Sequence, residues 1–364
     1  MRVLLISNMY PSKENPQFGI FVGNSEEILS RNGILIEKVV CTKKDGKISK
    51  LIQYLRFYVE SLFKLLFYKY DYVYVHYLSF SGLPVIIAKK FRKKIKIISN
   101  VHGSDVIPQN AKHKALNGIA KICAEVSDTV IVPSLYFKKE LKERWNINEN
   151  KVVIFPSGGI DSKIFYPKNN KSEMLLRFGL DNKFKYIGFV GRLTKGKGWE
   201  VLLDAINKIK YKEELKEYKF IFVGDGDSKE EFKNKIELLG LEDLIIKINF
   251  LNHVELSNLY NCLDLFCFPT EMRESLGLVG IEAMACGVPV IVSDFAALKE
   301  YVVEEFNGYL FSKGNYIDLS EKILIYINSN TEKKKRMKEN AYESSMKYRR
   351  ENIENILINL FSDS

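Results

Sequence analysis

The chain has 364 residues, of which 46% are hydrophobic and 27% charged, and its formal net charge is +10. This length suits two domains, and the composition excludes disordered and fibrous proteins. Residues 1–165 hold 26 Lys and Arg against 14 Asp and Glu, whereas the remaining residues hold 29 against 31. We therefore expect the first half of the chain to meet something anionic.

The N-terminal segment and the cysteines indicate a cytoplasmic protein. "MRVLLISN" is one short apolar run that stops at polar residues, and no uninterrupted apolar stretch reaches transmembrane length. The five cysteines are scattered without a C-x-x-C pair, which argues against both a disulfide framework and a zinc site. Reduced, buried thiols are the expectation.

Short, continuously apolar runs alternate with stretches of helical period along the whole chain. In the first half, the predicted strands are "RVLLIS", "LIEKVVC", "YVYVHY", "IKIIS", "TVIVPS" and "KVVIFPS". In the second half, they are "KYIGFVG", "KFIFVG", "IKINFL", "LDLFCFP", "VPVIVSD" and "GYLF". Such runs are typical of parallel strands covered on both faces. They predict two doubly wound α/β domains joined near "PSGGIDSKIFYPKNNKSE", with ligands in the cleft between them.

Two loops of the first half follow predicted strands. "PSKENPQFGIFVG" leads into a helix that Gly19 opens, and the amides there can meet a phosphate. "NVHGSDV" places His102 and Asp105 around a Gly-Ser turn at a strand end that faces the predicted cleft. A turn with an Asp helix cap explains the second string equally well.

Residues 47–70, "KISKLIQYLRFYVESLFKLLFYKY", have helical period and mix leucines, aromatic residues and cations. A buried helix explains the leucines, whereas a helix in a lipid headgroup layer also explains the aromatic and basic side chains. The run "KKFRKKIK" at residues 89–96 adds six cations to the same domain. An anionic membrane surface is therefore an expected partner.

"GRLTKGKGWE" follows the strand "KYIGFV" directly and places Arg192 and Lys197 on a glycine-rich loop. Two cations on such a loop suit a diphosphate, although a solvated basic turn is the alternative. The Walker A spacing is absent. Further on, "GDGD" has D-x-D spacing, but Ser228 and Glu231 after it form the pattern of a capping box, so we interpret the string as a turn before a helix rather than a metal site.

"RESLGLVGIEAMACGVPV" sets two glutamates, Glu274 and Glu282, around Gly277. The preceding "LDLFCFPT" is a predicted strand, so a helix is expected to start near Leu276 or Gly277. The backbone N–H groups of Gly277, Leu278 and Val279 are then unpaired donors at the positive end of a helix dipole, which suits a phosphate. Glu282 lies among apolar neighbours and needs a polar partner such as ribose hydroxyls, although helix-start and solvated positions would also explain the two carboxylates.

Taken together, these strings resemble the family 4 retaining glycosyltransferases, whose two Rossmann-like domains form the GT-B fold. The stretch from Glu274 to Glu282 is similar to the family's motif of two glutamates with seven residues between them, and "GRLTKGKG" to its diphosphate-binding loop. "HGSD", "PSGGID" and "VGDG" are similar to weaker signatures. The resemblance covers nearly the whole chain. It implies an acceptor-binding domain at residues 1–165, completed by a C-terminal helix at 346–364 that crosses back to it, and a donor-binding domain at 166–345.

The resemblance also implies a role for each of these positions. Arg192 and Lys197 would hold the leaving diphosphate, helped by the amides of Gly277, Leu278 and Val279, and Gly19 would touch the phosphates. Glu282 would take the ribose hydroxyls and Glu274 the transferred sugar. His102 would lie beside the sugar and the acceptor, with Asp105 as a weaker contact on that side. The implied catalytic residues are Glu274, His102, Arg192 and Lys197.

The expected activity is transfer of a hexose or related sugar from a nucleotide diphosphate sugar to a hydroxyl group, without a cofactor or bound metal. The expected acceptor is a glycan, above all a lipid-linked glycan or glycolipid of surface polysaccharide synthesis, at the inner face of the cell membrane. A nucleotide-sugar epimerase or hydrolase of the same fold is one alternative. A non-catalytic partner subunit is another, although such a subunit would be expected to have lost some of Glu274, Glu282, Arg192 and Lys197, and all four are present. No recognised motif supports nucleic-acid binding.

Overall fold

The computed structural model describes residues 1–108 and 110–362. The chain forms two compact units, Met1–Gly158 together with the C-terminal residues from Ile353, and Gly159–Asn352. We call them the first and the second unit and describe each by itself. The division lies a few residues before the predicted boundary at 165 and 166, and the C-terminal segment joins the first unit a few residues after the predicted position 346.

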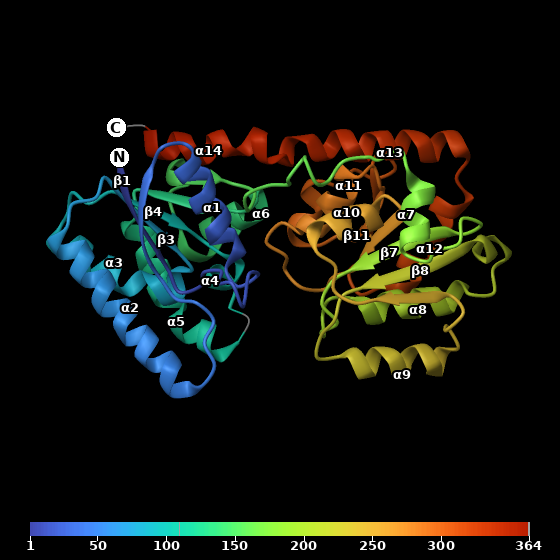
Figure 1. Ribbon diagram of the computed structural model, residues 1–364, viewed down its shortest axis with the longest axis horizontal. Coiled ribbons are helices and arrows are strands. Elements are labelled where there is room, and N and C mark those ends of the chain that lie inside the picture. The colour runs from blue at the N-terminus through green and yellow to red at the C-terminus, as the bar shows by residue number, and fades with distance from the viewer. Residues whose placement is uncertain (109, 363–364) are drawn as a thin grey trace. The chain divides into compact units, whose positions relative to one another are not determined.

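The first unit is built around a parallel sheet with helices on both of its faces (Figure 1). The sheet has six strands in the order β2-β1-β3-β4-β5-β6. Its strands are β1 (Arg2–Ser7), β2 (Leu35–Val40), β3 (Tyr72–His76), β4 (Ile97–Asn100), β5 (Thr129–Val132) and β6 (Val152–Ile154). Its helices are α1 (Ile20–Arg31), α2 (Lys47–Phe67), α3 (Leu78–Phe91), α4 (Gly103–Val106), α5 (Ala111–Val126), α6 (Leu135–Trp145) and α14 (Arg350–Ser362). Helices α1 and α14 cover one face of the sheet, and α2, α3, α5 and α6 cover the other.

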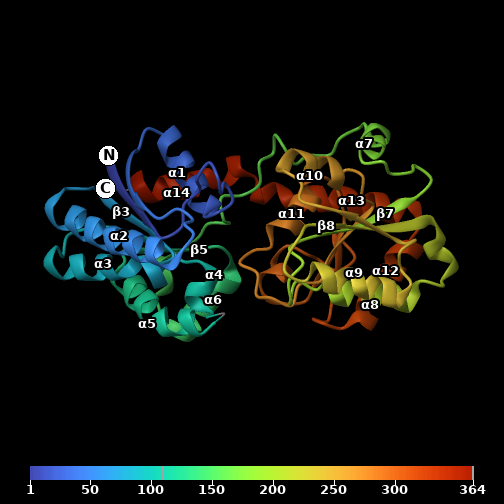
Figure 2. The same cartoon turned by 60° about the horizontal axis from the view of Figure 1, so that its bottom comes forward.

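The second unit repeats the plan with the parallel order β12-β11-β10-β7-β8-β9. Its strands are β7 (Lys185–Val190), β8 (Tyr218–Val223), β9 (Ile245–Ile248), β10 (Leu265–Phe268), β11 (Val290–Ser293) and β12 (Gly308–Phe311). Its helices are α7 (Lys171–Arg177), α8 (Trp199–Ile209), α9 (Lys229–Leu239), α10 (His253–Tyr260), α11 (Leu278–Ala285), α12 (Tyr316–Asn328) and α13 (Thr331–Ser345). Helices α8, α9 and α12 lie on one face, and α7, α10, α11 and α13 on the other (Figure 2).

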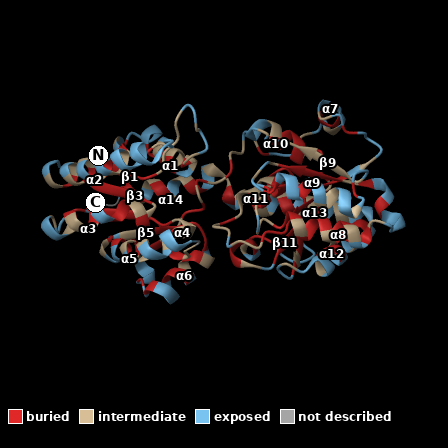
Figure 3. Ribbon diagram, turned by 90° about the horizontal axis from the view of Figure 1, so that it is seen from below, coloured by how far each residue is buried: buried red, intermediate tan, exposed pale blue. Residues whose placement is uncertain are grey.

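Each unit has an apolar core on both faces of its sheet, and the central strands are deeply buried (Figure 3), whereas the edge strands β2 and β9 are partly exposed. In β1 and β7 only the first residue is exposed, which is why the strands are continuously apolar rather than alternating. The C-terminal helix α14 completes the first unit, because Ile353, Leu357 and Phe361 are buried in the core beside α1. The prediction of two doubly wound domains is confirmed.

The cysteines and the helices bear on two further expectations. All five cysteines are free and buried, as expected. Among residues 1–108 and 110–362, no helix is long and apolar enough to cross a membrane.

Candidate active site

The strand order of the second sheet identifies where its ligand should bind. The chain runs from β7 through β8 to β9 in one direction and from β10 through β11 to β12 in the other. The direction reverses between β7 and β10, which pair directly. In open parallel sheets, ligands bind outside the carboxyl ends of the strands at such a switch point. Here, these ends lead into the predicted diphosphate loop and the stretch before Gly277.

The two loops pack closely against each other. Gly198, the N-cap of α8, has φ 82°, and a Cβ there would lie 1.8 Å from the carbonyl oxygen of Pro269. The backbone N–H of Glu271 donates to the carbonyl of Gly196 at 2.8 Å. Glycine is therefore required at 198 both by its left-handed conformation and by the approach of the neighbouring backbone.

This packing brings together two side chains that lie 77 positions apart in the sequence. The ammonium of Lys197 is 2.8 Å from Oε1 of Glu274, and both side chains are mostly buried, with 23% and 17% exposed. The hydroxyl of Thr270 donates to the same oxygen at 2.9 Å. Lys197 and Thr270 therefore fix the Glu274 carboxylate in one orientation.

Thr270 is not among the predicted site residues, although its position directly after an apolar strand could have indicated it. Its side chain is fully buried, and it stands just beyond the apolar strand β10, where a polar residue lies at the ligand-binding edge of the sheet.

The surroundings of Arg192 differ from those of Lys197. It is exposed, and in the described part of the chain its guanidinium has no hydrogen-bond or ion-pair partner.

Helix α11 starts at Leu278, with Gly277 as its N-cap at φ 80°. A Cβ on Gly277 would lie 2.5 Å from Cδ2 of Leu298, so this position also requires glycine. The amides of Leu278 and Val279 have no backbone partner among the described residues, as expected for a helix start, whereas Gly280 donates to the carbonyl of Gly277.

Glu282 lies in the second turn of α11, as predicted, and the neighbouring Ile281 and Ala283 are buried. Burial raises the pKa of its carboxyl to about 7. Its hydrogen-bond partner is the hydroxyl of Tyr260 in α10, which donates to Oε2 at a long 3.4 Å. The carboxylate is therefore only weakly satisfied by the protein and has capacity for further donors.

The "GDGD" stretch supports the diphosphate loop from the side of β8. Cβ atoms on Gly224 and Gly226 would lie 2.0 Å from the Gly191 carbonyl oxygen and 2.4 Å from that of Leu193, so both glycines allow close backbone packing. The predicted capping box at Ser228 is wrong: Ser228 is the N-cap of α9, but its side chain makes no cap hydrogen bond. Instead, its backbone N–H donates to the Leu193 carbonyl. The described residues contain no cluster of three metal-ligating side chains.

The first sheet has its own switch point, between β1 and β3. Gly19 lies in the connection after β1 and is the N-cap of α1, with φ 74°. A Cβ on Gly19 would lie 2.5 Å from the carbonyl carbon of Met9. The first turn of α1 contains no acidic side chain, so nothing there neutralises the positive helix end.

His102 follows β4 and belongs to an aromatic group with two residues at the end of β3. Its ring stacks on Tyr77 with centroids 3.7 Å apart, and its Nε2 lies 3.3 Å from Nδ1 of His76. Burial lowers the pKa of His102 to about 3 and that of His76 well below its ordinary value. Both rings are therefore neutral at physiological pH, so His102 carries no charge and its ring nitrogens can donate or accept hydrogen bonds.

Asp105 is buried, with 1% of its surface exposed. Its carboxylate accepts hydrogen bonds from the backbone N–H groups of Leu78, Ser79 and His102, at 2.9 to 3.1 Å. Burial raises the pKa of this carboxyl although the backbone donors lower it. Asp105 therefore ties the start of α3 to the His102 loop.

Two family models match the chain. Residues 22–161 match the model described as "Glycosyltransferase Family 4", and residues 171–344 match "Glycosyl transferases group 1". The chain is 30% identical over 358 residues to an uncharacterised glycosyltransferase of Methanocaldococcus jannaschii, covering 95% of this chain and 89% of the relative. It is 26% identical to N-acetyl-alpha-D-glucosaminyl L-malate synthase of Bacillus anthracis, over 75% of this chain and 69% of that protein.

Solved structures share the fold. The Anabaena protein HepE in complex with UDP and glucose has a TM-score of 0.77 and 18% identity, covering 100% of this chain and 99% of that one. Sucrose-phosphate synthase from Thermosynechococcus elongatus has a TM-score of 0.79 and 20% identity, covering 99% and 98%. The chain therefore belongs to family 4 of the glycosyltransferases, with the GT-B fold, and is a retaining glycosyltransferase that takes its sugar from a nucleotide-sugar donor.

Proposed function

We propose that the nucleotide sugar binds at the switch point of the second unit and that its sugar is a hexose or a related sugar. The observation that carries this proposal is the ion pair between Lys197 and Glu274, 2.8 Å long, because it joins the two motifs at the ligand-binding edge of one sheet. An ammonium retains two further donors when one is used. Lys197 can therefore hold Glu274 and a phosphate oxygen together.

The diphosphate is assigned to Arg192, Lys197 and the start of α11. Cleavage at the anomeric carbon places negative charge on the leaving diphosphate and positive charge on the sugar ring. The free guanidinium of Arg192, the ammonium of Lys197 and the amides of Leu278 and Val279 supply fixed positive charge where the negative charge develops. Such groups stabilise the transition state more than the ground state.

Glu282 is assigned to the ribose hydroxyls. Its carboxylate has only the long bond from Tyr260, so two hydroxyl donors would supply the partners that a half-buried carboxylate needs.

Glu274 is assigned to the transferred sugar. Lys197 and Thr270 bond to Oε1, and Oε2 has no partner among the described residues. Retention follows either from attack of the acceptor on the face of the leaving group, with a phosphate oxygen taking its proton, or from Glu274 acting as a nucleophile.

The first unit is proposed to bind the acceptor, with His102 beside the sugar and Gly19 near the phosphates. A neutral histidine can accept or donate a hydrogen bond to a hydroxyl group. Asp105 is proposed as a positioning residue rather than a direct contact, because its carboxylate is buried and accepts three backbone hydrogen bonds.

We propose a lipid-linked glycan or glycolipid as the acceptor, because of the exposed surface of helix α2. One side of α2 is buried at Phe57, Ser61 and Leu65. The opposite side carries an apolar stripe of residues that are each more than half exposed: Ile48, Leu51, Ile52, Leu55, Val59, Phe63 and Phe67. These positions repeat every three or four residues and share one helix face.

Exposed cations accompany this stripe in the same part of the first unit. Lys47, Lys50, Arg56 and Lys69 belong to α2 or its ends, and Lys90, Lys93 and Lys94 lie in or after α3, which packs against α2. All seven are exposed. An exposed apolar helix face in a cation-rich part of the surface is typical of a helix that lies in the headgroup layer of an anionic membrane. We propose that α2 holds the enzyme on the inner face of the cell membrane, beside its acceptor.

A panel of nucleotide sugars tested by thermal shift checks the donor assignment, because a bound ligand raises the melting temperature. The expected result is one donor that stabilises the chain and loses this effect in the Arg192→Ala variant. Stabilisation by that donor that is unchanged in Arg192→Ala contradicts the assignment. Incubation of the same donor with and without acceptor separates transfer from hydrolysis and epimerisation.

A further inference from the structure

The second unit has two adjoining pockets at the edge of the sheet opposite the candidate active site. Their volumes are about 330 and 400 Å³, and Lys338 of α13 lines both. The second pocket is lined by Lys185 and Tyr218, the first residues of β7 and β8, and by Asp264, just before β10. Because these strands are parallel, their amino ends lie at the edge away from the loops that hold Arg192 and Glu274.

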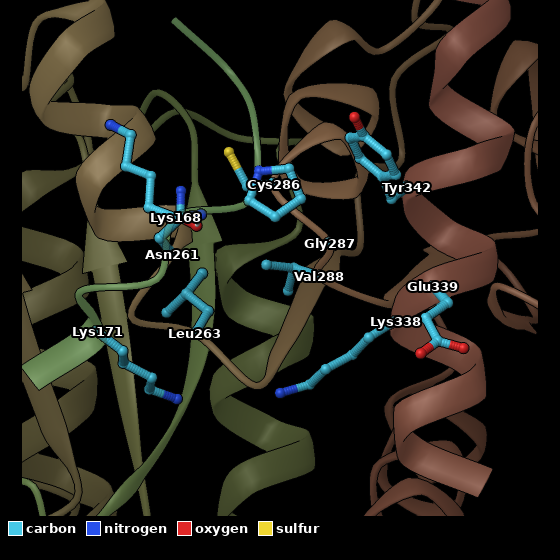
Figure 4. A pocket seen from close by; sticks show the side chains of 11 residues that line it. Lys168, Lys171, Asn261, Leu263, Cys286, Gly287, Val288, Lys338, Glu339 and Tyr342 are labelled. Atoms are coloured by element: carbon cyan, nitrogen blue, oxygen red, sulfur yellow. Dashed lines mark hydrogen bonds between the residues drawn. The ribbon is translucent and has the colours of Figure 1, made fainter. Parts of the chain in front are cut away.

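The pockets are rich in cations. Six lysines line them: Lys168, Lys171, Lys185, Lys334, Lys335 and Lys338. In Figure 4, Lys171 and Lys338 extend from opposite walls toward the same space. The lining carboxylates are Asp264 and, on the exposed side of α13, Glu339.

Asp264 forms ion pairs with two of the six lysines. Its carboxylate is 3.1 Å from the ammonium of Lys171 and 3.3 Å from that of Lys338, and it also accepts the backbone N–H of Tyr186. Burial alone would raise the pKa of Asp264, but the two cations and this hydrogen bond outweigh it and lower the pKa. This group pairs Lys171 and Lys338, whereas Lys168, Lys334 and Lys335 have no carboxylate partner in the described chain.

The remaining lysines have few anionic partners. Lys168 donates to the side-chain oxygen of Asn258, and Lys334 to the backbone carbonyl of Ile327. Lys335 is exposed and has no ion-pair partner in the described chain, whereas Lys185 pairs with Glu217 at 2.7 Å. Burial and the nearby cations Lys185 and Lys338 lower the pKa of Lys334, which is a sign of crowded positive charge.

We propose that these lysine-lined pockets bind a small phosphate-bearing anion at a site separate from that of the nucleotide sugar. Ammonium groups with unused donors bind phosphate oxygens strongly. The volumes suit a diphosphate or a phosphorylated small molecule. The phosphate can belong to a soluble compound or to a phospholipid headgroup, and the experiment distinguishes the two sources.

The test measures binding of inorganic diphosphate to the full chain by isothermal titration calorimetry, in an Arg192→Ala background that weakens binding at the donor site. Lys168→Gln/Lys335→Gln removes two cations without touching the partners of Asp264. The matched control is Lys208→Gln/Lys212→Gln, which removes two exposed lysines of the same unit. We expect the first pair to weaken diphosphate binding by about tenfold or more and the control pair to leave it unchanged.

Sedimentation with phosphatidic acid vesicles forms the second arm. If diphosphate does not bind, but vesicle binding falls in Lys168→Gln/Lys335→Gln and not in the control, the site takes a lipid headgroup. If neither diphosphate nor vesicle binding distinguishes the two pairs, the proposal is wrong. Circular dichroism checks the fold of each variant, and Lys335→Gln alone, at an exposed position, serves if the pair is unstable.

Discussion

Arg192 and Lys197 have different surroundings, although they share one loop. Arg192 is exposed without a partner, whereas Lys197 is mostly buried against Glu274. Changing either residue to Ala should remove about 3 kcal/mol of transition-state stabilisation, which is about a hundredfold in turnover. Steady-state kinetics at saturating donor measures this effect. Lys195→Ala is the matched control, because Lys195 is an exposed cation of the same loop; near-full turnover in Arg192→Ala or Lys197→Ala would show that the loop does not hold the diphosphate.

The pKa of Glu282 makes both donor binding and stability depend on pH. Its value of about 7 exceeds the ordinary 4.5, so the folded state holds this proton more tightly than the unfolded state. The associated stabilisation is fully present below pH 4.5 and is lost as the pH rises to about 7. Glu282→Gln should therefore gain stability relative to the natural chain across this window, as thermal melts at a series of pH values will show.

Donor binding should strengthen as the pH rises, whereas stability falls, because only the ionised carboxylate of Glu282 accepts hydrogen bonds from both ribose hydroxyls. The dissociation constant of the donor should rise as the pH falls through about 7, and Glu282→Gln should raise it and abolish this dependence. Glu274→Gln should instead lower turnover. Equal small effects from both variants would contradict these assignments and indicate that the two glutamates have only a structural role.

For single residues, the sequence predicts where a functional side chain lies in its helix or loop better than it predicts which side chains that residue contacts. Gly277 at the start of α11 and Glu282 in its second turn follow from the apolar strand before them and the helical period after them. The bond from Thr270 to Glu274 could not be predicted, because it depends on how two loops distant in sequence pack. Ser228 shows the converse error: a local capping pattern gave way to a backbone bond with Leu193.

At the scale of elements, the junction between α8 and β10 depends on Gly198. Gly198→Ala introduces both a left-handed alanine and a contact 1.8 Å from a backbone oxygen, and should cost about 3 kcal/mol or more. Gly240→Ala is the matched control: Gly240 also has positive φ, but its added Cβ would meet nothing closer than 4.0 Å, so about 1 kcal/mol is expected. Chemical denaturation measures both values, and equal losses would mean that packing against Pro269 contributes nothing.

The strands could be predicted because parallel strands covered on both faces consist of continuous apolar residues. The faces of α2 could not be assigned in the same way. Its sequence has apolar residues around most of the helix, so periodicity alone leaves open which ones are buried. The structure buries Phe57 and Leu65 and exposes Leu51, Leu55 and Val59, a choice that depends on where α3 and the sheet lie.

At the scale of the whole molecule, the two units share one architecture but differ in charge. The excess of cations belongs to residues 1–165, and the exposed apolar stripe of α2 lies in the same unit. The second unit carries the loops to which the donor is assigned. A chain in which one unit meets a charged surface and the other a soluble nucleotide sugar would need this asymmetry, since cations that attract an anionic leaflet act within about 10 Å at moderate salt.

This asymmetry predicts salt-dependent binding to anionic membranes through α2. Each cation near the membrane surface contributes about 1 kcal/mol to the free energy of binding. Burial of the apolar stripe adds about 25 cal/mol per Å² of apolar surface. Vesicle sedimentation should show binding at low ionic strength and release at high ionic strength. Leu51→Ser/Leu55→Ser/Val59→Ser should weaken binding by about tenfold or more.

The control for this prediction changes the same residue types in the other unit. Leu176, Leu238 and Val254 are exposed by 80%, 84% and 55%, so replacing them with Ser removes similar apolar surface outside α2. If the control weakens vesicle binding as much as the α2 variant, the binding is nonspecific adsorption of exposed apolar side chains. If the natural chain ignores anionic vesicles at low salt, the acceptor must be presented in solution, and the stripe on α2 must serve another purpose.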